Sequence, residues 1–299
     1  MKTNSPPLAL RRARAVDELL SSNWYNSIHF LGSFRPSAYD AQSQIVKHFK
    51  EPTESTLILQ PTLAHAYAKL VAEIARPENP DTIVRVLASS EMKPDPNRPL
   101  SLLTVQLSKT LGIPDRTDLF FRSDAREPMR YVEQLSGPDA LRKRLNYVSQ
   151  DIFLRPEQVG QRVLLVDDIY NLGATMRIYA AALKRFCGVE HVIAVNLAAT
   201  RFRKSKDEHG DLWLDLEQFA AHAKSCLTRT AKKAWAGTDP FQIGWIRDDI
   251  FHAVRECPAL GPAKARKTLL FLQGKDAKVC AECRENAGWW RKVMRIVGR

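Results

Sequence analysis

Residues 163–176, VLLVDDIYNLGATM, constrain the fold more than any other stretch of this chain. Four apolar residues lead into the adjacent carboxylates Asp167 and Asp168, and a short turn with Gly173 then precedes a helical pattern. The apolar run predicts a buried strand that ends at the acid pair. Because burial of charge is costly and like charges repel, we expect the two carboxylates to have a function.

The segments around this strand predict an α/β fold with a parallel sheet. Apolar and β-branched runs alternate there with helical patterns, as in parallel strands joined by crossover helices. Ligands of such sheets bind beyond the carboxyl ends of the strands, where the acid pair would lie. We expect strands at 82–88, 118–122, 162–168 and 191–199, and helices at 100–112 and 175–186.

The regions on either side of this core have a helical apolar spacing. A Pro-rich break at 75–81 separates the first region from the core. We therefore expect a helical N-terminal region (1–80), an α/β core (81–203) and a basic, mainly helical C-terminal region (204–299).

The turn after the acid pair is suited to an anion. Residues 171–175 would present successive backbone N–H groups at the start of a helix, where the helix dipole favours phosphate. Gly173 allows close approach, and Thr175 adds a hydroxyl donor. The carboxylates can accept hydrogen bonds from sugar hydroxyls or face Mg²⁺, so a ribose 5-phosphate group fits this order. The alternative is a strand that ends in a solvated turn, where the glycine serves only the bend.

This stretch resembles the ribose-5-phosphate-binding motif of type I phosphoribosyltransferases. In that family a strand ends in two acidic residues, followed by a hydrophobic residue, a variable residue and Thr-Thr-Gly-x-Thr. Asn171 and Leu172 replace the Thr-Thr pair. Leu172 lacks a hydroxyl whose hydrogen bond to a charged group would be worth about 1.5–3 kcal/mol. The matching residues are Asp167, Asp168, Ile169, Gly173 and Thr175.

Further elements are similar to the ComF-type, competence-associated members of this family. Those proteins carry a Leu-Ser and an Arg-x-Asn element before the motif, and Leu135-Ser136 and Arg144-Leu145-Asn146 resemble them. The resemblance covers roughly residues 82–200 and is most specific at the acid pair and the turn after it.

The resemblance implies transfer of ribose 5-phosphate from phosphoribosyl pyrophosphate (PRPP), with Mg²⁺, to a nucleobase. Asp167 and Asp168 would hold the ribose hydroxyls, whereas Ser89, Ser90 and Lys93 would lie at the pyrophosphate. The segment 122–150 would be a mobile hood, with Arg122, Arg126 and Arg130 as candidate pyrophosphate ligands. The 5′-phosphate would be held by Asn171, Leu172, Gly173, Ala174 and Thr175. Alternatively, the basic side chains are solvated loop charges.

Two other functions stay open. The same fold could bind PRPP or a nucleotide without turnover and regulate a partner that handles DNA or RNA. The C-terminal third could also bind nucleic acid directly, because residues 201–299 contain 20 Lys and Arg against 12 Asp and Glu. A homodimer is one of the assemblies that we expect for this protein. The acceptor base has no signature in the sequence.

Composition limits where the protein works. The chain has 299 residues and a net charge of +12, without an apolar run of about 18 residues that would span a membrane. The first residues lack the apolar segment of a secretory signal, so we expect a cytoplasmic protein without a membrane partner. Five cysteines, an odd number, favour a reducing compartment.

The C-terminal cysteines suggest a metal site. Cys280 and Cys283 form a Cys-x-x-Cys pair, and Cys257 and His252 could complete a structural Cys₃His zinc site. Cys226 and His222 are competing ligands. The alternative is a pair of thiols on a helix. The N-terminal zinc ribbon of ComF-type proteins is absent, because no cysteine precedes Cys187.

Overall fold

The computed structural model describes residues 16–35, 40–129, 131–200, 214–235, 238–261, 265–274 and 277–285. They divide into two compact units. The first contains the described residues up to Leu31 together with Tyr67–Thr200, and the second contains Gly32–Ala66 and the described residues after Thr200. The predicted division into three separate regions stays a prediction.

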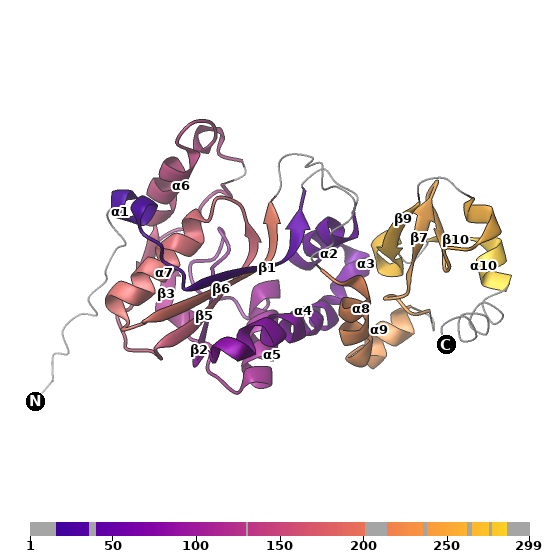
Figure 1. Cartoon of the computed structure of the whole chain (residues 1–299), viewed down its shortest axis with the longest axis horizontal. Coiled ribbons are helices and arrows are strands. Elements are labelled where there is room, and N and C mark those ends of the chain that lie inside the picture. The colour runs from indigo at the N-terminus through magenta and orange to yellow at the C-terminus, as the bar shows by residue number, and fades with distance from the viewer. Residues whose placement is uncertain are drawn as a thin grey trace, which may run out of the picture. The chain divides into compact units, whose positions relative to one another are not determined.

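The first unit is built on a four-stranded sheet with the strand order β1-β6-β5-β2 (Figure 1). β5 pairs in parallel with both β2 and β6, which confirms the α/β class with a parallel sheet. β5 is one of the two inner strands of this sheet, and its four consecutive apolar residues, Val163–Val166, are fully buried. The strands are β1 (Ser27–Phe34), β2 (Thr82–Arg85), β5 (Arg162–Tyr170) and β6 (His191–Thr200).

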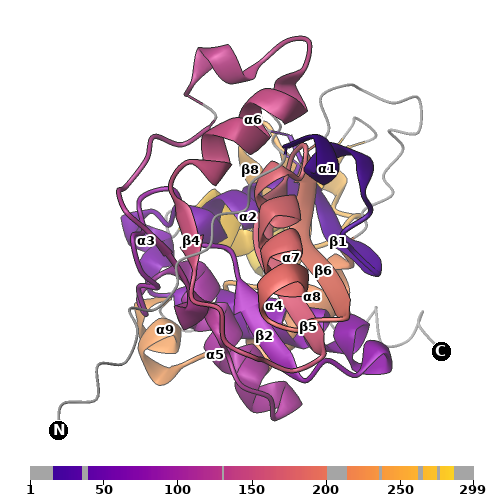
Figure 2. The ribbon, with the colours of Figure 1, turned by 90° about the vertical axis from the view of Figure 1, so that its left-hand side faces the viewer.

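Helices cover both faces of this sheet. α7 (Ala174–Phe186) lies across β5 and β6 and packs with α1 (Val16–Ser21) and α6 (Ala140–Ser149) (Figure 2). Its apolar residues, such as Ile178 and Leu183, join one core with alternate residues of the strands. On the opposite face, α5 (Pro99–Leu111) packs against β2 and β5.

A short antiparallel ribbon follows α5. β3 (Phe120–Arg122) pairs with β4 (Ile152–Leu154), and α6 lies in the segment between them. The ring of Phe120 stacks on Tyr179 of α7 with 4.0 Å between centroids, which fixes the ribbon to the core.

The second unit contains a second sheet with the order β10-β8-β7-β9. β7 is antiparallel to β8 and β9, and β10 is parallel to β8. Its strands are β7 (Ile243–Arg247), β8 (Ile250–His252), β9 (Arg266–Leu269) and β10 (Lys278–Val279). Its helices are α2 (Ala41–Lys50), α3 (Glu54–Leu57), α8 (Leu216–Ser225), α9 (Arg229–Ala234) and α10 (Ala281–Glu285), and α4 (Gln60–Ala75) begins in this unit and continues into the first.

The structure corrects the expected helical character of the two ends. The C-terminal region has the expected helices but also the second sheet, and the N-terminal region contributes β1. These strands were missed because β7 to β10 have two to five residues, too few to show a clear alternation. β1 has no continuous apolar run, since His29 and Ser33 interrupt it.

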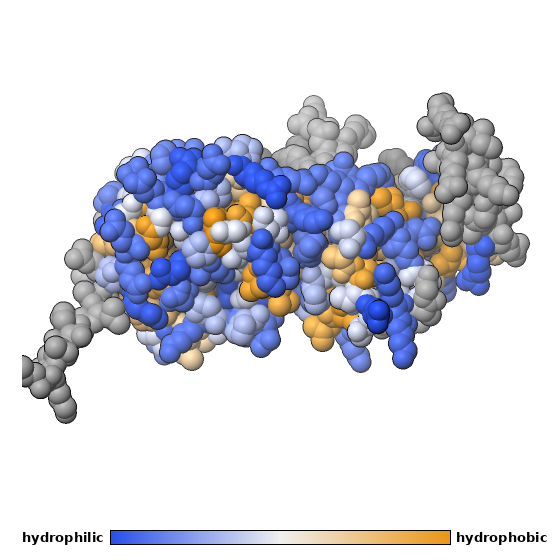
Figure 3. All heavy atoms as spheres, turned by 90° about the horizontal axis from the view of Figure 1, so that it is seen from below, coloured by the Kyte–Doolittle hydropathy of each residue, from blue (hydrophilic) through white to orange (hydrophobic). Residues whose placement is uncertain are grey.

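No helix within the described residues is long and apolar enough to cross a membrane. The face shown in Figure 3 is mostly hydrophilic, with separate small groups of hydrophobic residues.

Candidate functional site

The acid pair lies at the carboxyl end of β5, at the expected edge of the sheet. β5 continues to Tyr170, so Asp167 and Asp168 belong to the strand but are partly exposed. The backbone N–H of Asp168 donates to Asp167 Oδ1 at 2.8 Å, and that of Ile169 donates to Asp168 Oδ1 at 2.6 Å.

The turn after β5 requires glycine at position 173. Gly173 has a φ of 74°, and a Cβ atom there would lie 2.4 Å from Tyr170 Oη. A larger residue would therefore be strained and would also collide with the tyrosine ring. The Tyr25 hydroxyl donates to the Gly173 carbonyl at 3.4 Å, and burial, together with Tyr170, raises the pKa of Tyr25 and keeps it a donor.

The helix that follows starts without a side-chain cap. α7 has 13 residues, and no described side chain accepts a hydrogen bond from its first turn. Asp40, Asp215 and Thr228 cap α2, α8 and α9, whereas α5 and α6 also start without a side-chain cap. The first N–H groups of a helix have no intrahelical acceptor, so this end of α7 is suited to an anion. The five predicted phosphate ligands, residues 171–175, lie in this turn and at the start of α7.

The loop after β2 is organised by a buried ion pair. Arg85 Nη2 donates to Glu91 Oε1 at 2.7 Å, and both side chains are almost fully covered. Glu91 also accepts the backbone N–H groups of Ala88 and Asp95 at 2.6 and 2.9 Å. Burial alone would raise the pKa of Glu91, but these hydrogen bonds and the charge of Arg85 outweigh burial and lower it.

Arg122 and Arg126 also hold this loop. Arg122 is buried, and its guanidinium donates to the backbone carbonyls of Leu87 and Ala88. The backbone N–H of Arg126 donates to the Ser89 carbonyl at 2.9 Å. Burial, together with the nearby Arg122, lowers the pKa of Arg126 to about 10, so its side chain stays charged near neutral pH.

The remaining predicted pyrophosphate ligands lie in the loop after β2 and in the segment after β3. Lys93 is exposed and lines a cavity of about 480 Å³. Ser90 Oγ accepts a hydrogen bond from Arg98 at 2.8 Å, and Arg130 lies outside the described residues. The pyrophosphate roles of Ser89, Ser90, Lys93 and Arg126 stay predictions. The other residues of the cavity are Pro94, Asp118, Phe120, Phe121 and Arg155.

The two elements that resemble ComF-type proteins contact each other. Arg144 Nε donates to the Leu135 carbonyl at 3.2 Å, which joins the middle of α6 to the turn before this helix. This contact stabilises the segment between β3 and β4 but identifies no ligand.

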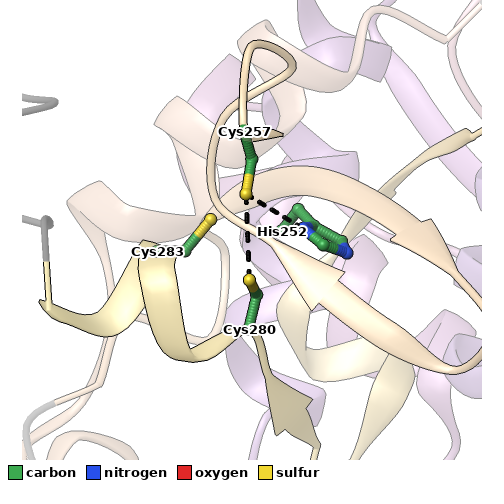
Figure 4. Close-up of side chains that lie close together, drawn as sticks. All are labelled: His252, Cys257, Cys280 and Cys283. Carbon is green, nitrogen blue, oxygen red and sulfur yellow. Dashed lines mark hydrogen bonds between the residues drawn. The ribbon is translucent and has the colours of Figure 1, made fainter. Parts of the chain in front are cut away.

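A second candidate site lies in the second unit. The ligand atoms of His252, Cys257, Cys280 and Cys283 all lie within 4.8 Å of one another (Figure 4). The Cys257 and Cys280 sulfurs are 3.7 Å apart, and His252 Nδ1 is 3.3 Å from Cys257 Sγ. Tetrahedral zinc with bonds of about 2.1–2.3 Å requires ligand separations of about 3.5–3.8 Å. The cluster is therefore close to the geometry that a metal such as zinc requires.

Local structure brings these four ligands together. His252 ends β8 and Cys280 directly follows β10, and the backbone N–H of Cys280 donates to the Phe251 carbonyl at 2.9 Å. Cys283 follows one turn later on α10. All three sulfurs are buried free thiols, and burial, together with the hydrogen bonds that the Cys257 thiol makes to Cys283 and Cys280, raises the pKa of Cys257 to about 12.

The competing ligands lie outside the cluster. Cys226 Sγ is 3.3 Å from the Ala223 carbonyl and 3.8 Å from the Thr62 carbonyl, as expected for a thiol that ends a helix. His222 does not belong to the group of four residues whose ligand atoms converge.

The chain was compared with known proteins. No protein-family model and no curated protein matches it. Its structure is similar to hypoxanthine phosphoribosyltransferase from Trypanosoma cruzi, at 19% identity over 58% of this chain and 76% of that one, with a TM-score of 0.27. It is also similar to adenine phosphoribosyltransferase from Leishmania donovani, at 16% identity over 66% and 88%, with a TM-score of 0.29.

Sequence reasoning missed three residues around the acid pair and the loop after β2. Tyr25 comes from a segment expected to be helical, and the importance of Glu91 depends on its partner Arg85. Asn196 had a signal, because it is the one polar residue within the apolar run 192–199 of a buried strand.

Proposed function

We propose that this protein binds the ribose 5-phosphate group of PRPP or of a nucleotide where β5 meets α7. One observation carries the proposal: two carboxylates at the end of β5 are followed by a glycine turn and a helix start without a side-chain cap. The backbone N–H groups of the turn and of α7 bind the 5′-phosphate, and Asp167 and Asp168 accept hydrogen bonds from the ribose diol.

The reaction that fits best is transfer of ribose 5-phosphate to a nitrogenous base, with release of pyrophosphate. The reacting sugar carbon becomes positively charged, so nearby carboxylates stabilise it and the leaving group needs cations. Lys93 and Arg126 are the proposed cations of this chain. Mg²⁺, which prefers oxygen ligands, fits the acid pair and would neutralise charge on the pyrophosphate.

We further propose that the four-residue cluster holds one structural Zn²⁺. Three thiolates and one imidazole leave no open coordination position, which is the pattern of structural rather than catalytic zinc. Deprotonation of three adjacent buried thiols is unfavourable without a cation, and zinc provides that cation.

A binding module without turnover is the second candidate. The observation in its favour is Leu172, which replaces a hydroxyl residue in the phosphate turn. α9 exposes Arg229, Lys232 and Lys233, and these charges suit a nucleic acid or a protein that handles nucleic acid. The module would then regulate this partner in response to PRPP or a nucleotide.

A calorimetric titration with PRPP and Mg²⁺ tests binding. Wild type should show saturable binding that is weakened about 10- to 100-fold in Asp168→Asn and kept in Asp17→Asn, which changes an exposed carboxylate on α1. A screen of bases for pyrophosphate release then separates an enzyme from a binding module. Absence of binding at millimolar PRPP in the wild type would refute the assignment of the site.

A further inference from the structure

Asn196 lies beside the acid pair but has no part in the proposed ligand contacts. It belongs to β6 and pairs in register with Asp167 of β5. Paired residues of parallel strands point to the same face of a sheet. This is the face that α7 covers, because Val163, Leu165, Val192 and Ala194 of the same alternation join the core with α7.

The side chain of Asn196 is fully buried and makes no hydrogen bond to a described residue. Its exposed fraction is 0%, and neither Oδ1 nor Nδ2 has a hydrogen-bond partner among the described residues. A buried amide without partners destabilises the folded state, so such groups are rare in native proteins. An aliphatic residue would pack here at lower cost, as at the neighbouring positions Ala194 and Ala198. A polar group kept at a cost in stability indicates a role in function.

We propose that Asn196 is a positioning residue for Asp167, a role that rests on the proposed ribose-phosphate site. When the ligand engages the acid pair, the Asn196 amide donates to the Asp167 carboxylate across the strand pair. A carboxylate accepts about four hydrogen bonds, so it can keep the bond from the Asp168 N–H at the same time. This second bond fixes the direction of Asp167 toward the ribose diol.

Asn196 acts through Asp167 and does not contact the ligand, because its side chain is fully buried. Without ligand, the unpaired Asn196 amide lowers the stability of the folded state. When ligand is bound, the hydrogen bond to Asp167 removes this cost. Removal of the amide should consequently change stability and affinity in opposite directions. A purely structural role would move both in the same direction or leave affinity unchanged.

The test compares two substitutions of similar shape, Asn196→Val and Asn196→Thr, of which only threonine keeps a donor. Asn196→Val should raise the melting temperature by roughly a few degrees. It should weaken the affinity for PRPP with Mg²⁺ by about tenfold. Asn196→Thr should recover part of that affinity. The matched control is Asn26→Val, which should lower stability, because Asn26 Oδ1 accepts bonds from Val192 N and Lys184 Nζ, both at 2.9 Å.

Each outcome decides the proposal. Wild-type affinity in Asn196→Val, or a lower melting temperature in that variant, would overturn the positioning role while the ribose-phosphate site stands. Failure of the wild type to bind both PRPP and ribose 5-phosphate would instead refute the proposed function, and the positioning role with it.

Discussion

The two candidate sites are built in opposite ways. The cysteine–histidine cluster uses four side chains from separate segments between His252 and Cys283, and their ligand atoms already lie within 4.8 Å of one another. The proposed ribose-phosphate site uses the consecutive residues 167–175, and most of the hydrogen-bond donors that it offers are backbone N–H groups. A convergent side-chain site depends on its metal for local structure, whereas a backbone turn is formed by the strand and helix around it.

This difference predicts different consequences of removing each ligand. Loss of metal should disturb the fold of the second unit, because four buried polar groups would remain without a common partner. Loss of the phosphate ligand should leave the first unit folded, because its core of apolar strand and helix residues does not depend on the turn.

The largest effect is therefore expected from removal of the proposed zinc. The purified protein should contain about one zinc per chain, and Cys280→Ser should abolish that zinc and cooperative unfolding of the second unit. Structural zinc contributes on the order of 10 kcal/mol in small zinc domains. Elemental analysis and thermal unfolding check this, with Cys226→Ser, a thiol outside the cluster, as the control. Full stability of the metal-free protein would mean that neither site needs its ligand in order to fold, which would contradict the difference drawn between the two sites.

The second-largest loss of stability is expected in the loop after β2, which the buried Arg85–Glu91 ion pair holds. Glu91→Gln leaves Arg85 buried without its counter-charge, so the free energy of unfolding should fall by about 3–5 kcal/mol. Urea unfolding of the variant measures this, and Glu190→Gln, an exposed position, is the control. A change below about 1 kcal/mol would mean that the pair contributes no more than a surface salt bridge.

The same carboxylate predicts a pH dependence. The pKa of Glu91 is lower in the folded state than in the unfolded state. The ionised carboxylate therefore stabilises the fold fully above the unfolded pKa of about 4.3, and this stabilisation is lost as the pH falls through the pKa of the folded state. Unfolding of the wild type at several pH values should show stability falling below about pH 4, with a shallower slope in Glu91→Gln. Parallel slopes in the two proteins would refute this source of acid sensitivity.

A smaller effect is expected at the acid pair itself. Asp168→Asn removes one charged acceptor for the ribose diol or the metal, so affinity for PRPP with Mg²⁺ should fall about 10- to 100-fold. Its melting temperature should stay close to that of the wild type, since the side chain is partly exposed. Unchanged affinity would remove the ribose assignment and leave the turn without a function.

The contrast between the two candidate sites also shows which features the sequence could predict. β5, Gly173 and the start of α7 were predictable, because the strand, turn and helix signals are local and consecutive. The metal ligands were predictable as residue types, but only the pairing of β8 with β10 places Cys280 near His252. The role of Glu91 depends on its partner Arg85, the position of Asn196 beside Asp167 depends on the register of β5 and β6, and the short strands of the second sheet have too few residues for a periodic signal. These features require the three-dimensional arrangement.

The smallest expected effect tests whether the turn is a phosphate site of the type its sequence resembles. Leu172 is half-buried beside the start of α7, and Leu172→Thr restores a hydroxyl donor at a position where the related motif has one. A gain of one hydrogen bond to a charged group should tighten binding of PRPP up to about tenfold, with little change in stability. Leu172→Val is the control, because valine has the shape of threonine without the hydroxyl and should give no gain. If threonine and valine weaken binding equally, the side chain at 172 does not face the phosphate, and the backbone N–H groups alone make the site.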